Sequence, residues 1–204
     1  MSKPNFKPQA GDILFTRIDG PFSWFLRLVN GSFGYSHACL VGKSENGEMM
    51  VYTTGACHRH ELIFCYGKIK ASEYLGKREY IICRYRGSGS KGLSDKQKKA
   101  ILAWCQHHVG TPYPWNKAWQ YYRQALHGLG VHRFNFKNRH KGEVLCYESV
   151  AAAYQNAGIE LNPRAGNRMA AAYDIKELYF SPYLHDVYSF ERHKDGAQML
   201  TTAG

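Results

Sequence analysis

The chain has 204 residues, which is enough for one compact domain with a sizeable hydrophobic core. Hydrophobic residues make up 44% of it and aromatic residues 14%, and this composition excludes an intrinsically disordered chain. The net charge is +11, from 27 Lys and Arg against 16 Asp and Glu. That sign favours anionic partners, such as nucleic acid, phospholipid or acidic cell-wall polymers.

No window of the sequence reaches the roughly eighteen apolar residues that a membrane-spanning helix needs. Residues 1–15 also lack the apolar stretch of a signal peptide, so we expect a soluble, cytoplasmic protein. The six cysteines show no paired short spacing of the disulfide or zinc-ribbon kind. Free thiols are therefore expected, with no metal and no cofactor.

The first half of the chain has the pattern of a small antiparallel sheet, interrupted by a short amphipathic helix. Asn46-Gly47 suits the two central positions of a type I′ turn and predicts a hairpin with a two-residue loop. The expected elements are a strand at 11–15, the helix at 21–31, hairpin strands within 36–42 and 49–54, and strands at 61–67 and 78–87.

The second half of the chain has the pattern of helices. Ser94 and Gln97 predict a capping box for a helix that ends near His108, with Ile101 and Cys105 on its apolar face. Residues 1–190 are expected to form a single domain, and the polar residues 191–204 a mobile tail. Further helices are expected at 115–127, 146–158 and 168–179.

Cys146 is the candidate nucleophile, because it stands where the helix of residues 146–158 begins. The unpaired N–H groups and the positive dipole end of a helix N-terminus favour the reactive thiolate. His37, on a predicted strand, is the candidate base, since histidine commonly activates a thiol of this kind. The cysteines at 39, 83 and 105 lie in apolar strand or helix patterns and are expected in the core.

An ordered set of segments carries a family resemblance: GDILF at 11–15, YSHACLVG at 35–42, VGTPYPW at 109–115, LCYESVAAAY at 145–154 and IKELYFSPYL at 175–184. Together they resemble the circularly permuted branch of the NlpC-type cell-wall hydrolases, which are bacterial and viral relatives of the lecithin:retinol acyltransferase fold. The resemblance implies an α+β, permuted papain-like fold, with a small antiparallel sheet packed against helices.

The resemblance also assigns roles. His37 matches the strand histidine of the family's SHxxLV pattern, and Cys146 matches its helix cysteine. Tyr113 matches a tyrosine that lines the cleft, although Pro114 stands where the family often has an aspartate. Tyr113 and Tyr147 are the candidate substrate-binding residues. N–H groups at the start of the Cys146 helix are expected to receive the oxyanion.

The third catalytic residue depends on the register of the hairpin. A two-residue loop at Asn46-Gly47 sets Cys39 opposite Thr54, which puts Thr54 on the same face as His37 and Thr53 on the other. Thr54 is therefore the predicted orienter of the imidazole. A slip of one residue would give this role to Thr53. His58, at or just beyond the end of the strand, is a further alternative.

Two other groups have simpler interpretations. Cys57, His58, His60 and Cys65 do not match a standard zinc spacing, and strand alternation separates Cys57 from the two histidines. The basic and aromatic segment at 132–141 suits single-stranded nucleic acid, but no accompanying nucleic-acid motif is present, and a solvated loop is the favoured interpretation.

We expect a thiol hydrolase that works through an acyl-enzyme on Cys146, with a peptide or lipid acyl substrate that can be anionic. The resemblance favours an amidase or endopeptidase on cell-wall peptides. A lipid acyl hydrolase or acyltransferase of the same fold is one alternative. A catalytically silent basic binding module is the other.

Overall fold

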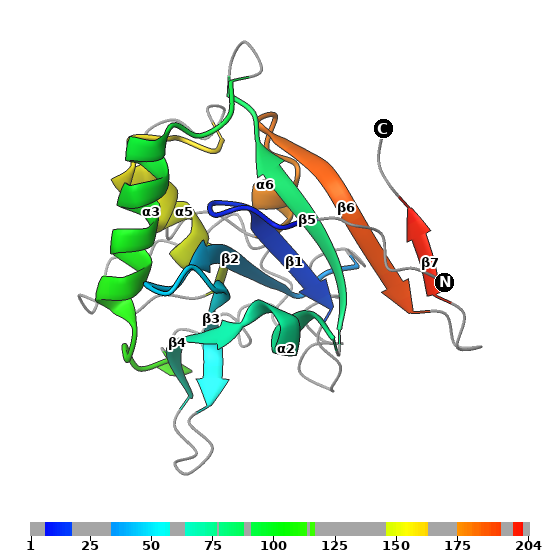
Figure 1. Ribbon diagram of the computed structural model, residues 1–204, viewed down its shortest axis with the longest axis horizontal. Coiled ribbons are helices and arrows are strands. Elements are labelled where there is room, and N and C mark those ends of the chain that lie inside the picture. The colour runs from blue at the N-terminus through cyan, green and yellow to red at the C-terminus, as the bar shows by residue number, and fades with distance from the viewer. Residues whose placement is uncertain are drawn as a thin grey trace.

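The structure is a computed structural model, and it describes residues 7–17, 34–57, 64–76, 78–87, 91–113, 115–116, 146–162, 175–192 and 198–201. A seven-stranded sheet crosses the molecule in the order β4-β3-β2-β1-β5-β6-β7, and every pairing in it is antiparallel (Figure 1). The strands are β1 (Ile13–Arg17), β2 (His37–Lys43), β3 (Met49–Cys57), β4 (Phe64–Lys70), β5 (Glu79–Tyr85), β6 (Leu184–Arg192) and β7 (Gln198–Thr201). This confirms the α+β class that the sequence predicts.

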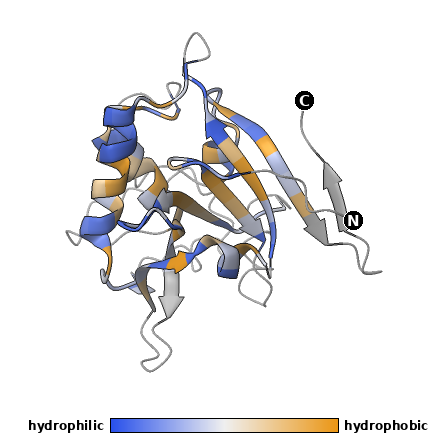
Figure 2. Cartoon of the chain, viewed as in Figure 1, coloured by the Kyte–Doolittle hydropathy of each residue, from blue (hydrophilic) through white to orange (hydrophobic). Residues whose placement is uncertain are grey.

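The two faces of the sheet are covered by different helices. Side chains of α3 (Asp95–His108), α5 (Cys146–Asn156) and α6 (Ile175–Tyr179) join one apolar cluster with alternate residues of the strands. The other face carries a second cluster, which includes α2 (Ala71–Leu75). Hydrophobic colour concentrates on the central strands, whereas much of α3 is hydrophilic (Figure 2). The α5 face and the α2 face are therefore distinct environments.

The hairpin loop is one residue longer than predicted. Gly47 N donates to Ser44 O at 3.0 Å, and Ser44 N donates to Glu48 O at 2.8 Å, so three residues connect the strands. Gly47 has φ +78°, the left-handed conformation that glycine supplies at the end of such a loop. Leu40 consequently pairs with Tyr52, and the predicted register is wrong by one residue.

The pairing of β2 with β3 ends before it reaches His37, the candidate base. Their pairing runs from Lys43–Met49 to Leu40–Tyr52, while β2 continues along β1 as far as His37. The strand β3 instead continues along β4, with an irregularity between Thr54 and Ala56. The first residues of β2 therefore lack a β3 neighbour in the ladder, although the Thr53 side chain still contacts His37 and Cys39.

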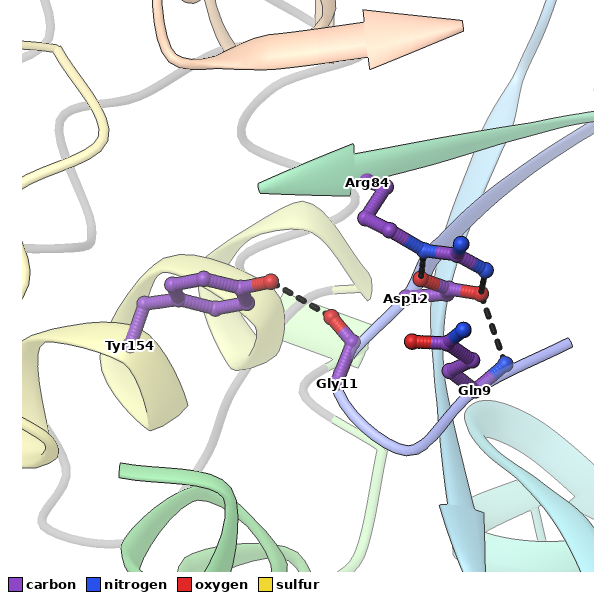
Figure 3. Close-up of polar contacts among 5 residues, drawn as sticks. All are labelled: Gln9, Gly11, Asp12, Arg84 and Tyr154. Carbon is purple, nitrogen blue, oxygen red and sulfur yellow. Dashed lines mark hydrogen bonds and ion pairs between the residues drawn. The ribbon is translucent and has the colours of Figure 1, made fainter. Parts of the chain in front are cut away.

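An ion pair between the buried Asp12 and the half-buried Arg84 secures the beginning of β1 (Figure 3). Asp12 is 2% exposed, and its two carboxylate oxygens accept hydrogen bonds from Arg84 Nε and Nη2, each at 2.8 Å. Gln9 N donates to the same carboxylate at 2.7 Å. A buried carboxylate needs this degree of compensation, because the loss of its hydration is costly.

The residue before the ion pair joins β1 to α5. Tyr154 Oη donates to Gly11 O at 2.5 Å, and Tyr154 is fully buried (Figure 3). Gly11 has φ +92°, and a Cβ there would lie 2.3 Å from Leu93 Cδ1. The conformation and the space both favour glycine at this position, so the GD pair fixes the chain where the helix docks.

Other elements differ from the predictions at their ends. The capping box of α3 is confirmed, with Gln97 N donating to Ser94 Oγ at 3.3 Å.

The tail at 191–204 was expected to be mobile, but Leu184–Arg192 continues into it and Gln198–Thr201 adds β7 to the sheet edge. The helix expected at 21–31 and nearly all of that at 115–127 lie outside the described residues, and that expected at 168–179 is described only as α6. Within the described part of the chain, no helix has the length and apolar character to cross a membrane.

We predict that Tyr154→Phe lowers the free energy of unfolding by about 1 to 2 kcal/mol, because it leaves the buried Gly11 carbonyl without its donor. Urea denaturation monitored by circular dichroism measures this change. Tyr183→Phe is the matched control, since it removes the same atom from a half-buried tyrosine outside this contact. Equal stability of the two variants would show that the bond does not hold α5 to β1.

Candidate active site

His37 begins β2 and is held by Thr53. The imidazole is 7% exposed, and its Nε2 lies 2.5 Å from Thr53 Oγ1. The one-residue change in register places Thr53 and His37 on the same face of the sheet. Thr53 and not Thr54 therefore contacts the imidazole, because the longer loop exchanges the faces on which the β3 side chains were predicted to lie.

The hydrogen bonds of Thr53 define the tautomer of His37. Thr53 Oγ1 donates its single proton to Thr54 O at 3.1 Å, so it can only accept from the imidazole. Nε2 must then carry a proton, and Nδ1 keeps the lone pair. Among the described residues, no hydrogen bond is made to Nδ1. His37 is thus arranged to accept a proton at Nδ1.

Thr54 has a different environment from the predicted one. It faces the α5 side with Tyr52, and its Oγ1 is buried without a hydrogen-bond partner in the described part of the chain. A buried hydroxyl without a partner costs about 1 to 3 kcal/mol of desolvation. Thr54 therefore does not orient His37.

Cys146 is the first residue of α5, as the sequence predicts, and its side chain is partly exposed. Burial of the sulfur raises the pKa of this thiol to about 11, although the backbone N–H groups of Ala38 and Tyr147 act in the opposite direction. The neighbouring Glu148 raises the pKa further. The expected thiolate is thus not the resting form, because desolvation outweighs the helix N-terminus.

The imidazole is neutral in the same site. Burial, with a smaller contribution from the charge of Arg78, lowers the pKa of His37 to about 4. At pH 7 the pair consists of a thiol and a neutral imidazole. Proton transfer would therefore have to accompany attack rather than precede it.

The two side chains approach β2 from different sides. The α5 helix packs with Ala38 and Leu40, whereas His37 bonds Thr53 among the residues of the α2 face. The Cys146 sulfur lies against the N–H of Ala38, which is the residue after His37. No hydrogen bond joins Cys146 to His37 among the described residues, so the predicted pair is neighbouring but not in contact.

Residues 110–112 pass along the edge of β4. Tyr66 N donates to Thr111 O and Gly110 N donates to Tyr66 O, each at 2.8 Å. The pKa of Tyr113 is raised by burial and by the proximity of Cys146 and Glu148. Tyr113 thus lies near the thiol, as the cleft prediction requires.

Of the remaining candidates, Tyr147 is partly buried and packs against the apolar cluster on the α5 face. His58, His60 and the segment 132–141 lie outside the described residues, as does the side chain of Cys57. Within the described residues there is no group of three His, Cys, Asp or Glu side chains able to hold a metal ion.

Two neighbours of His37 were missed by sequence reasoning. Tyr74 lies on α2, where the sequence predicted no element, and Arg78 lies just before β5, at the first position of the strand predicted at 78–87. Arg78 stacks on the Tyr74 ring, with its Cζ 4.2 Å from the ring centroid. One tyrosine and one arginine four positions apart carry no recognisable signal by themselves.

Comparison with known proteins shows a similarity of fold. No family model matches the chain, and no curated protein matches it. A crystal structure of the metalloprotein yiiX from Escherichia coli O157:H7 is similar to it, with a TM-score of 0.61 and 18% sequence identity. The match covers 90% of this chain and 98% of that one. Identity this low shows a shared fold alone.

We predict opposite stability effects for the two adjacent threonines. Thr53→Val removes the acceptor of His37 Nε2 and should lower the free energy of unfolding by about 1 to 2 kcal/mol. Thr54→Val has the same change of shape but removes a hydroxyl without a partner, so stability should be unchanged or higher. Chemical denaturation at pH 7 measures both. The reverse order would restore the register predicted from Asn46-Gly47.

We also predict that alkylation of Cys146 by iodoacetamide accelerates about tenfold per pH unit from pH 7 to 10, because a thiol with a pKa near 11 is only about 0.01% thiolate at pH 7. Peptide mass spectrometry follows the rate at this residue. The urea-denatured chain is the control, and its rate should level off near pH 8.5. A plateau below pH 7 in the folded protein would contradict the neutral pair.

Proposed function

We propose that the protein is a thiol hydrolase with a permuted papain-like arrangement, in which Cys146 is the nucleophile and His37 the base. The observation that carries this proposal is the placement of the Cys146 sulfur, at the start of α5, against the backbone of the residue that follows His37. Thr53 holds His37 with Nδ1 as the proton acceptor. A half-buried cysteine near an oriented base is the arrangement that acyl transfer needs.

The neutral resting pair fits a concerted first step. As Sγ attacks the carbonyl carbon of the substrate, its proton passes to Nδ1 of His37 and the carbonyl electrons move to the oxygen. Collapse of this intermediate expels an amine, which takes the proton from His37 and leaves a thioester. Water then attacks the thioester with His37 as base, and this step releases a carboxylic acid and restores the thiol.

The gap between β2 and β3 is where we propose that the two groups meet. The sulfur lies against the N–H of Ala38 on the α5 side, and Nδ1 is the imidazole nitrogen that Thr53 does not contact. The N–H groups of Ala38 and Tyr147, which now point at the sulfur, are suited to stabilise negative charge on the substrate oxygen.

We propose a peptide amide, of the kind found in cell-wall peptides, as the substrate class. A peptide backbone needs hydrogen-bond partners, and the described neighbours of the thiol offer backbone N–H groups and the phenol of Tyr113. An acyl chain would instead need an apolar groove. The net charge of +11 suits a peptide that carries carboxylates.

The similar structure belongs to a protein described as a metalloprotein, so metal dependence is part of the test. The mechanism proposed here uses the thiol and the imidazole and assigns no step to a metal. Activity should therefore survive treatment with EDTA. Loss of activity on chelation, and recovery with a divalent metal, would replace this mechanism with a metal-dependent one.

The experiment is hydrolysis of a panel of short cell-wall peptides, with anionic phospholipid vesicles as the competing substrate. We predict release of a free amine from a peptide, and loss of roughly a thousandfold or more of this activity in Cys146→Ala and in His37→Gln. Cys105→Ala is the matched control, because Cys105 is a fully buried cysteine of α3 away from the site.

Three outcomes would contradict parts of the proposal. Full activity in Cys146→Ala would remove the nucleophile assignment. Fatty acid release from vesicles, with no cleavage of peptides, would assign the site to lipids. No hydrolysis of either substrate, together with strongly salt-dependent binding of nucleic acid, would favour the binding module.

A further inference from the structure

A chain of buried polar groups extends from His37 across the α2 face of the sheet. Cys39 Sγ donates to Thr53 Oγ1 at 3.3 Å and lies 3.1 Å from Tyr74 Oη. Tyr74 Oη also lies 3.4 Å from Thr16 Oγ1. All of these side chains are nearly inaccessible to solvent, so each hydrogen bond matters to its partners.

The direction of each hydrogen bond in the chain can be derived from the available donors. Burial raises the pKa of Cys39 to about 12, and it also raises the pKa of Tyr74. Both groups therefore keep their protons at neutral pH. The Cys39 proton goes to Thr53, and therefore Tyr74 must donate to the Cys39 sulfur. Each proton in this chain has one acceptor.

These bonds converge on one hydroxyl. Thr53 Oγ1 accepts from the Cys39 thiol and from His37 Nε2, and it donates to Thr54 O. A hydroxyl has one proton and two lone pairs, so this set saturates it. The Cys39 proton occupies the lone pair that would otherwise let the Thr53 hydroxyl rotate and donate to the imidazole.

We propose that Cys39 and Tyr74 are positioning residues, which lock the Thr53 hydroxyl and thereby hold His37 as the tautomer with the proton on Nε2 and the lone pair on Nδ1. The effect of these residues on catalysis rests on the proposed function, but their effect on the tautomer of His37 does not. A cysteine is suited to the middle position because its sulfur is large enough to reach both oxygens from one strand residue.

Nuclear magnetic resonance tests the proposal without any substrate. Long-range ¹H–¹⁵N correlation at pH 7 distinguishes the two neutral tautomers, and the spectrum of His37→Gln identifies the signals of His37. We predict that the wild-type imidazole is protonated at Nε2. In Cys39→Ala, the Nδ1-protonated form should become populated, because Thr53 is then free to donate. Cys39→Ser, which keeps a donor and an acceptor, should retain most of the wild-type tautomer.

Matched variants separate this effect from ordinary loss of packing. Cys105→Ala also removes a fully buried thiol, and Tyr188→Phe changes another buried tyrosine of the α2-face cluster. Both should leave the His37 signals unchanged. Tyr74→Phe should shift them in the same direction as Cys39→Ala, by a smaller amount. Circular dichroism selects the variants that fold, and Cys39→Ser provides the readout if the alanine variant does not.

The outcomes for the tautomer and for catalysis are distinct. A wild-type His37 protonated at Nδ1, or a Cys39→Ala variant that folds with an unchanged tautomer, would overturn the proposal. Where peptide hydrolysis is present, Cys39→Ala should reduce kcat about five- to tenfold with little change in KM, as expected for one lost hydrogen bond. The predicted tautomer in a protein without hydrolytic activity would support the positioning role and refute the proposed function.

Discussion

The joint between β1 and α5 is the constraint on which the placement of the site depends. Asp12 is buried and ion-paired to Arg84 of β5, and the carbonyl of the preceding Gly11 accepts the hydroxyl proton of Tyr154. Tyr154 lies eight residues after Cys146 on the same helix, so this contact sets how far the first turn of α5 reaches over β2. The ion pair and the tyrosine thus fix α5, and with it the Cys146 sulfur, relative to the central strands of the sheet.

The ladder between β2 and β3 ends close to that sulfur. Beyond the Leu40–Tyr52 pair, β2 pairs with β1 alone among the described strands, and the N–H of Ala38 donates to the sulfur of Cys146. The alternation of side chains along β2 sets His37 on the opposite face, where Thr53 contacts its Nε2. The proposed base thus lies on one face of the sheet, and the proposed nucleophile lies on the other.

The sequence predicts what depends on local patterns, and it fails where a single backbone choice decides. The capping box of α3 and the helix start at Cys146 follow from neighbouring residues and are confirmed. The choice between Thr53 and Thr54 depends on whether the loop has two residues or three, and Asn46-Gly47 is compatible with both. The thiol pKa was also inaccessible from sequence, because the desolvation that raises it comes from tertiary packing.

The most direct test of the central claim is an experimental structure of the protein after reaction with a peptide aldehyde, which forms a covalent hemithioacetal with a catalytic thiol. We predict the adduct on Cys146, with Nδ1 of His37 within hydrogen-bonding distance of the sulfur or of the hemithioacetal oxygen, and Nε2 still on Thr53. An adduct on another cysteine would contradict this account. So would an adduct on Cys146 with Nδ1 of His37 beyond hydrogen-bonding distance of both the sulfur and the hemithioacetal oxygen.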